Sequence, residues 1–216
     1  MSEPSASSVS VTVVDHPLAA ERLRVLRDAT TTNARFRHAL DELGGMLVYE
    51  ATRTIPTVDA EVRTPLGPAP GRRIETQPLL VPILRAGIGL LNAAFRLLPD
   101  ASAGFVGLAR DEETFAPKSY VNKLPERLDD LPCIVVDPML ATGGSLEHTC
   151  RILVERGAPA PITVVCVLAA PEGIERMRNS GISLRIFTAA IDSHLNEQAF
   201  IVPGLGDAGD RQFGMY

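Results

Sequence analysis

The sequence predicts an α/β protein with a central parallel sheet that is flanked by helices. Runs rich in Val, Ile and Leu, typical of strands buried on both faces, alternate with segments whose apolar residues recur every three or four positions. The strand-like runs lie at residues 78–84, 104–109, 133–137, 162–169 and 184–191. The helical patterns lie at residues 86–98, 145–157 and 172–181. Because ligands of such sheets bind beyond the carboxyl ends of the strands, we expect functional residues in the loops there.

The N-terminal third adds two helices and a hairpin to this sheet. Pro17 opens an amphipathic pattern over residues 16–29, and Asn33 is a suitable N-cap for a second helix. Residues 53–77 carry four prolines, short alternating runs and a Pro-Gly turn, which predicts a protruding β-arm suited to subunit contact. The 216 residues form a single domain in this interpretation, with a loose segment at residues 1–12.

Composition argues against several classes of protein. The net charge of −5 and the aromatic content of 5% disfavour a nucleic-acid-binding or membrane-binding surface. No apolar run has the length of a membrane span or the place of a signal-peptide core. Cys133, Cys150 and Cys166 lack CxxC spacing and lie in apolar patterns, which indicates buried, reduced thiols. We therefore expect a cytoplasmic protein.

The segment IVVDPMLATGGS, residues 134–145, contains the first candidate site. Pro138 ends a buried strand because it has no N–H for the ladder, and a Thr-Gly-Gly-Ser turn then exposes backbone N–H groups that suit a phosphate. Ser145 also caps a helix that runs to about residue 156. A capped turn alone would explain the glycines and the serine but not Asp137, and the missing Lys excludes a Walker loop. The pattern predicts a ribose-phosphate site in which the acid holds sugar hydroxyls.

Two arginines follow other predicted strands. Arg85 comes after the strand of residues 78–84, and Arg110 comes after that of residues 104–109. The guanidinium group offers a planar fork of donors to phosphate oxygens. A solvated surface position is the commoner fate of a single arginine, but two of them just past strand ends favour an anion site.

At these residues the chain resembles the type I phosphoribosyltransferases, which use phosphoribosyl diphosphate (PRPP). The Asp-Pro form, DPMLATGGS, is similar to the uracil phosphoribosyltransferase version of the PRPP signature, where most of the superfamily carries two adjacent acids. Three further stretches match that family in order: VPILRAGIG, ARDEET and LNEQAFIVPGLGDAGDRQFG. The resemblance extends from about Val14 to the chain end.

The resemblance implies a role for each matching residue. Arg85 and Arg110 bind the diphosphate of PRPP and, with Asp137, are the catalytic residues. The remaining PRPP-binding positions are Pro138, Met139, Leu140, Ala141, Thr142, Gly143, Gly144, Ser145 and Asp207. Uracil is bound by the main chain at Ile201, Gly206, Asp207 and Ala208, within a C-terminal hood of residues 192–216. Residues 111–124 are a mobile flap over the site, although a plain exposed loop is an equal alternative from the sequence alone.

The resemblance also implies the other partners. The substrates are uracil and PRPP, and Mg²⁺ arrives bound to PRPP, since Pro138 occupies the place of a second acid and no protein-held metal is expected. His16, His38 and His148 show no metal-ligand spacing. The family further implies a GTP effector and a homodimer or larger homo-oligomer.

Two other functions stay open at this point. One is a PRPP-fold regulator that binds RNA, which the acidic balance disfavours. The other is transfer to a different base such as orotate, whose carboxylate would need an extra cation, for which Arg211 is a candidate. Two motifs are rejected. The GLGDAG segment at residues 204–209 lies too near the chain end for the helix and strand of a dinucleotide site, and residues 192–194 are consecutive and cannot form a local catalytic triad.

Overall fold

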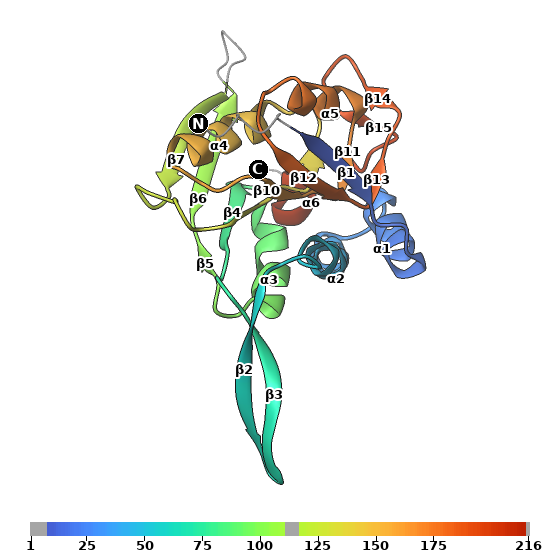
Figure 1. The fold of residues 1–216 in the computed structure, drawn as a ribbon. Coiled ribbons are helices and arrows are strands. Elements are labelled where there is room, and N and C mark those ends of the chain that lie inside the picture. The colour runs from blue at the N-terminus through green and yellow to red at the C-terminus, as the bar shows by residue number, and fades with distance from the viewer. Residues whose placement is uncertain (1–7, 111–116, 215–216) are drawn as a thin grey trace.

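The computed structural model describes residues 8–110 and 117–214, with the backbone alone at residues 109, 110 and 117–119. Its helices are α1 (Pro17–Arg27), α2 (Asn33–Ala51), α3 (Ile88–Leu97), α4 (Gly144–Glu155), α5 (Pro171–Arg178) and α6 (Ala208–Phe213). Figure 1 shows a layered α/β body from which one long hairpin extends. Among the described residues, no helix combines the length and the apolarity needed to cross a bilayer.

An eight-stranded sheet forms the centre of the molecule. Its strands, in spatial order, are β1 (Val9–Val13), β12 (Leu184–Thr188), β10 (Ile162–Val165), β8 (Cys133–Val136), β4 (Leu79–Leu84), β6 (Phe105–Arg110) and β7 (Pro117–Lys123), and β5 (Ser102–Ala103) also pairs with β4. All these pairs are parallel except β6 with β7. The predicted parallel sheet is therefore confirmed.

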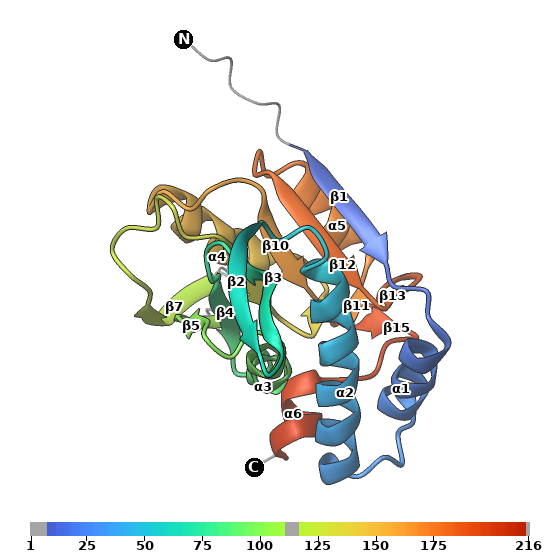
Figure 2. The ribbon, with the colours of Figure 1, turned by 60° about the horizontal axis from the view of Figure 1, so that its bottom comes forward.

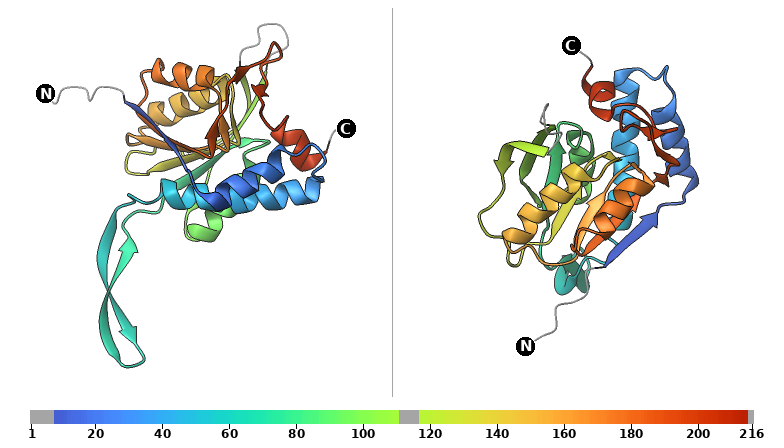
Figure 3. Two further views of the ribbon diagram at one scale, coloured as in Figure 1. Left: turned by 90° about the vertical axis from the view of Figure 1, so that its right-hand side faces the viewer. Right: turned by 90° about the horizontal axis from the view of Figure 1, so that it is seen from above.

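Helices cover both faces of this sheet, and the strand side chains alternate between two cores. Ile134 and Val136 of β8 pack in the core beneath α1, α2 and α3, whereas Cys133 and Val135 pack in the core beneath α4 and α5. Figure 3 shows α4 and α5 on one side of the sheet and the N-terminal helices on the other. Burial on both faces explains why the central strands are continuously apolar.

A smaller parallel sheet continues the carboxyl edge of the main one. Its strands are β9 (Met139–Leu140), β11 (Leu168–Ala169) and β13 (Ala190–Ile191), which follow β8, β10 and β12 along the chain. The two short strands β14 (His194–Leu195) and β15 (Ile201–Val202) then pair with each other near the C-terminus. The loops of the predicted site extend from this edge.

Part of the N-terminal segment is ordered into the main sheet, contrary to our expectation for residues 1–12. Val9–Val13 form β1, which pairs in parallel with β12. Val9 and Val11 pack against the core beneath α4 and α5. Apolar residues at alternate positions therefore give this segment one face to bury. Residues 1–7 lie outside the described part.

The β-arm is confirmed as an antiparallel hairpin of β2 (Thr57–Thr64) and β3 (Gly67–Ile74). It projects away from the body in Figure 1 and is turned toward the viewer in Figure 2, and Leu66 at its tip is fully exposed. The turn follows Thr64, whose hydroxyl accepts hydrogen bonds from the amides of Leu66 (3.1 Å) and Gly67 (3.2 Å). The Pro-Gly pair expected at the turn lies inside β3 instead.

Helix α2 begins one residue earlier than the sequence pattern predicted. The N-cap is Thr32, whose hydroxyl accepts a 3.4 Å hydrogen bond from the amide of Arg35. Asn33, the predicted cap, is the first helical residue. Adjacent residues of similar capping strength are not separated by local preference alone.

Candidate active site

The strand-to-helix connection of residues 137–145, here called the phosphate bend, leaves the sheet between β8 and α4. The amide of Asp137 donates to the carbonyl of Val165 (3.1 Å), and the carbonyl of Pro138 accepts from the amides of Val167 (2.9 Å) and Leu168 (3.1 Å). These main-chain bonds fix the start of the phosphate bend to the neighbouring strands. The side chain of Asp137 is thereby placed at the carboxyl edge, as the sequence predicted.

Glycines allow the phosphate bend to lie against α5. Gly143 has φ +77°, and a Cβ on Gly173 would lie 2.4 Å from the carbonyl oxygen of Ala141, closer than real contacts permit. The N-cap of α4 is Gly143, which corrects the prediction of Ser145; Ser145 lies inside the first turn. Amides of a first helical turn have no intrahelical partner, so those of α4 are available to an anion; the Gly144 amide makes only a long 3.5 Å contact with the Thr142 hydroxyl.

A cavity of about 330 Å³ lies between the phosphate bend and the C-terminal segment. Its lining residues are Ala86, Asp137, Met139, Ala141, Gln198, Ala199, Phe200, Ile201, Gly206, Asp207, Ala208 and Gly209. All four positions expected to contact the base therefore border the same space as Asp137. The sequence analysis did not assign Gln198, Ala199 and Phe200, which precede β15, to the site. They lie in LNEQAF, part of the C-terminal stretch that matches the family, and that match could have indicated them.

Two carboxylates share this cavity. Burial, and next the negative charge of Asp207, raise the pKa of Asp137 to about 7, although a hydrogen bond from the Met139 amide acts in the opposite direction. Asp207 is the N-cap of α6 and accepts a 2.8 Å hydrogen bond from the amide of Asp210. A half-buried acid beside a second acid favours a ligand that brings hydroxyl donors or a cation.

Of the two predicted arginines, Arg85 follows β4 and Arg110 ends β6, and these two strands are neighbours in the sheet. Arg85 is exposed at the start of the β4–α3 turn, and its Nη2 lies 3.6 Å from Oδ1 of Asp210. A Cβ on Gly87 would lie 2.5 Å from the carbonyl oxygen of Val136, so this turn packs closely on the end of β8. Arg110 is the last residue of β6, and its side chain lies outside the described atoms.

The predicted flap of residues 111–124 is in part regular structure. Pro117–Lys123 form β7, which pairs in an antiparallel sense with β6. The polar sequence conceals this strand, since an edge strand needs no continuous apolar run. Residues 111–116 lie outside the described part.

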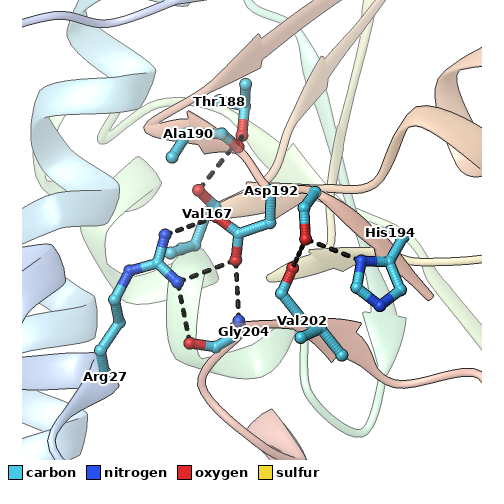
Figure 4. A network of polar contacts seen from close by, with 9 residues as sticks. Arg27, Val167, Thr188, Ala190, Asp192, His194, Val202 and Gly204 are labelled. Atoms are coloured by element: carbon cyan, nitrogen blue, oxygen red, sulfur yellow. Dashed lines mark hydrogen bonds and ion pairs between the residues drawn. The ribbon is translucent and has the colours of Figure 1, made fainter. Parts of the chain in front are cut away.

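Polar contacts with α1 hold the C-terminal segment, residues 192–214, here called the hood (Figure 4). Arg27 donates to both oxygens of Asp192, at 2.8 and 2.6 Å, and to the carbonyl of Gly204 at 2.9 Å. The amide of Gly204 donates to Asp192 at 2.8 Å. Burial alone would raise the pKa of Asp192, but the hydrogen bonds from Arg27 and Gly204 and the charge of Arg27 hold it below its ordinary value. The Arg27–Asp192 ion pair, in which the carboxylate is buried, is thus one attachment of the hood to α1.

Arg211 is not available as the cation considered for an orotate carboxylate. Its guanidinium donates to the carbonyls of Leu26, Asp28 and Leu205 and lies 4.5 Å from the centre of the Phe36 ring. These contacts tie α6 to the end of α1. They turn the charge of Arg211 toward main-chain oxygens.

The two rejected motifs are also explained by the structure. Contrary to our expectation, a helix does begin within residues 204–209, but it is the six-residue α6, and no described strand follows it. Asp192 pairs with Arg27, whereas the hydroxyl of Ser193 lies 2.8 Å from Nδ1 of His194 and donates to the carbonyl of Val202 (2.7 Å). Asp192 is therefore directed to Arg27 and away from the Ser193–His194 pair, so the three residues do not form a catalytic triad.

The residues around the cavity fit a Mg²⁺ ion that arrives with a ligand. In the described part of the chain, no three His, Cys, Asp or Glu side chains gather as a metal site. Asp137 and Asp207 nevertheless give the cavity hard, negatively charged oxygens, which Mg²⁺ prefers in combination with ligand oxygens and water.

Comparison with known proteins agrees with this geometry. Residues 13–215 match the family model described as uracil phosphoribosyltransferase. The uracil phosphoribosyltransferase of Corynebacterium efficiens is 52% identical over 206 residues, which cover 95% of this chain and 97% of that protein. That of Corynebacterium glutamicum is 49% identical over the same coverage. The solved structure of the AQ2163 protein from Aquifex aeolicus has a TM-score of 0.90 and 38% identity, covering 95% of this chain and 99% of that one. The chain belongs to the uracil phosphoribosyltransferase family.

Proposed function

We propose that the protein transfers the phosphoribosyl group of PRPP to N1 of uracil, which yields UMP and diphosphate. The observation that carries this proposal is that one cavity is bordered by both Asp137 and residues 206–208. A donor sugar and an acceptor base must lie side by side in such a reaction, and one cavity with a sugar-binding wall and a base-binding wall provides that arrangement.

The phosphate bend supports binding of the ribose 5-phosphate part of PRPP. The first-turn amides of α4 receive the 5′-phosphate, and Asp137 accepts hydrogen bonds from the ribose hydroxyls. Arg85 and Arg110 neutralise the diphosphate as it leaves, while positive character develops at the anomeric carbon. Mg²⁺ carried by PRPP would supply further neutralisation of the diphosphate, and Asp137 and Asp207 are the carboxylates of the cavity that would add oxygen ligands to that ion.

The hood supports binding of the base. Ile201 and residues 206–208 border the cavity, and their main-chain groups are the proposed partners of uracil, which alternates acceptors and a donor along its edge. Fixed main-chain groups reject an amino group at C4, because the wrong base leaves buried polar groups unpaired. Since Arg211 is engaged with main-chain carbonyls, the hood offers no such cation to the carboxylate of orotate.

The test is incubation with PRPP and Mg²⁺ together with uracil, cytosine, orotate or hypoxanthine in separate reactions. We expect UMP from uracil and no nucleotide from the others. Equal use of orotate would contradict the assignment of the base, and no product from any base would overturn the reaction itself.

We also propose that the protein is a cytoplasmic homodimer or larger homo-oligomer that uses the β-arm as a contact. Leu66 and Val62 on this hairpin are exposed apolar side chains, which suits an interface. Sedimentation velocity of the wild-type chain and of Leu66→Asp tests this: we expect an oligomer that the variant weakens, and a monomeric wild type would contradict it. The GTP effector is proposed from the family resemblance alone, and initial rates with and without GTP test it.

A further inference from the structure

Next to the phosphate bend lies a cluster of charged residues that the proposed reaction does not yet use. Glu147 of α4 binds two arginines at once: Nε of Arg176 lies 2.6 Å from its Oε2, and Nη2 of Arg151 lies 2.6 Å from its Oε1. Arg176 comes from α5, which lies beside α4 in Figure 3. One carboxylate and two guanidinium groups leave the cluster with a net positive charge.

The two arginines differ in how fully they are engaged. Arg151 uses Nε and Nη2 on Glu147 and also donates to the carbonyl of Ser180 (3.2 Å). Arg176 uses only Nε, and within residues 8–110 and 117–214 no hydrogen bond occupies its Nη1 or Nη2. Both arginines therefore share the one carboxylate, and Arg176 keeps two donor groups for another partner.

The free end of Arg176 lies against the phosphate bend. A Cβ built on Gly143 would lie 3.2 Å from Cδ of Arg176, and one built on Gly144 would lie 3.6 Å from its Nη1. Gly144 is the first residue of α4, so the guanidinium is beside the helix end where first-turn amides are unpaired. With 48% of its side chain exposed, Arg176 can reach a ligand there without disturbing the core.

A purely structural role does not account for this arrangement. Exposed ion pairs contribute little to stability, and Glu147 already has a second arginine. The hydrogen bond from Arg176, and after it the one from Arg151, hold the pKa of Glu147 below its ordinary value, although burial acts in the opposite direction. Glu147, which anchors Arg176, is therefore ionised at neutral pH. An ionised anchor keeps the guanidinium in position before a ligand arrives.

We propose that Arg176 is an additional binding residue for the 5′-phosphate of the ribose, held in place by Glu147. The assignment depends on the proposed function, since it presumes that the phosphate bend receives that phosphate. Arginine forms short, charge-assisted hydrogen bonds with phosphate oxygens. Because Arg176 lies beside the phosphate bend, it should strengthen the binding of ligands that carry a 5′-phosphate. It should not affect the binding of diphosphate, which is expected at Arg85 and Arg110.

The experiment measures dissociation constants for UMP and, separately, for inorganic diphosphate with Mg²⁺, by titration calorimetry. Arg176→Gln should raise the dissociation constant of UMP about tenfold and leave that of diphosphate unchanged. Arg176→Lys should recover part of the UMP affinity, because it keeps the charge but loses the fork. The matched control is Arg178→Gln on the same helix, where Arg178 pairs with the exposed Glu175 at 3.7 Å, and it should change neither constant.

The outcomes separate this inference from the proposed function. An Arg176→Gln chain that binds UMP as tightly as Arg178→Gln overturns the role of Arg176, even if the wild type forms UMP from uracil. Equal weakening of UMP and diphosphate would mean that Arg176 supports the fold of the site and not one phosphate, and would also overturn it. A wild type that neither binds nor forms UMP overturns the proposed function and this inference together.

Discussion

The sugar-phosphate wall of the cavity grows directly out of the buried sheet, whereas the base wall is a C-terminal segment tied to α1 by polar contacts. The phosphate bend follows β8, which is fully buried, and Gly143 of the bend lies close to the carbonyl oxygen of Gly173 in α5. The hood relies on the Arg27–Asp192 pair and on the carbonyl contacts of Arg211. Apolar packing is insensitive to pH and salt, while ion pairs are not, so the two walls should respond differently to mutation and to conditions.

The largest expected effect is on the sugar-phosphate wall, at Asp137. We expect Asp137→Asn to lower kcat/KM for PRPP about 10²–10³-fold, because it removes the charged acceptor for the ribose hydroxyls.

The pKa of Asp137 is raised to about 7 from 3.8. A raised acid pKa means that ionisation costs stability, and this cost grows as pH rises from 3.8 to about 7 and is complete above it.

Calorimetric melting temperatures provide the second readout for this variant. Asp137→Asn should melt at a higher temperature than the wild type at pH 8, and the difference should shrink at pH 4. A variant that is less stable than the wild type at pH 8 would contradict the burial of this carboxyl group.

The next effect tests the base wall. Asp192→Asn should destabilise the protein by about 3 kcal/mol, because it leaves Arg27 without a charged partner in a mostly buried site. It should also raise KM for uracil about tenfold while the affinity for diphosphate stays the same, because the hood loses its fixed position. Urea denaturation and steady-state kinetics measure the two effects.

The control for the base wall is Arg24→Leu on the same helix. Arg24 pairs with Glu21 at the surface, so the free energy of unfolding of this variant should stay within about 0.5 kcal/mol of that of the wild type.

The pKa of Asp192 is lowered, so the stability advantage of the wild type over Asp192→Asn is present above pH 3.8 and is lost as pH falls through the lowered pKa. An advantage that persisted unchanged at pH 2 would argue against the ion pair.

A smaller effect tests how closely the phosphate bend is packed. Gly173→Ala places a Cβ 2.4 Å from the carbonyl oxygen of Ala141, so the main chain must move. We expect a loss of about 1–3 kcal/mol in stability and a higher KM for PRPP. Gly45→Ala in α2 is the matched control: no atom lies within 4 Å of its new Cβ, and helix propensity should make it equal to or more stable than the wild type. Equal behaviour of the two variants would refute the tight packing.

The smallest effect should be seen with a thiol reagent. Cys133, Cys150 and Cys166 are all buried, and burial raises the pKa of each thiol to about 12. The native protein should therefore react negligibly at pH 8, and all three thiols should react after unfolding in guanidinium. Rapid reaction of one thiol in the native state would show that the sheet beneath the phosphate bend opens more easily than its packing suggests.

Local patterns in the sequence were sufficient for the regular elements and for the phosphate bend. Continuous apolar runs located β4, β8 and β10, because strands buried on both faces must be apolar throughout. Apolar patterns did not reveal the edge strands β1 and β7, which we expected to be loose or loop-like. An edge strand buries less apolar surface than a central strand, so its sequence is less continuously apolar. The N-cap residues were displaced by one or two positions for a similar reason, since neighbouring residues compete for the same role.

The sequence alone located the carboxylate, the glycines and the arginines at strand ends. Their roles could be predicted because they depend on the residue type and on the few residues beside it in the chain. Folding decided which distant residues meet. Arg27 and Asp192 are 165 positions apart, and no local pattern pairs them. Folding likewise turned Arg211 away from the cavity, brought residues 198–200 to it, and set Arg176 beside Gly144. Such contacts depend on how α1, α4 and α5 pack on the sheet, which the spacing of residues along the chain does not record.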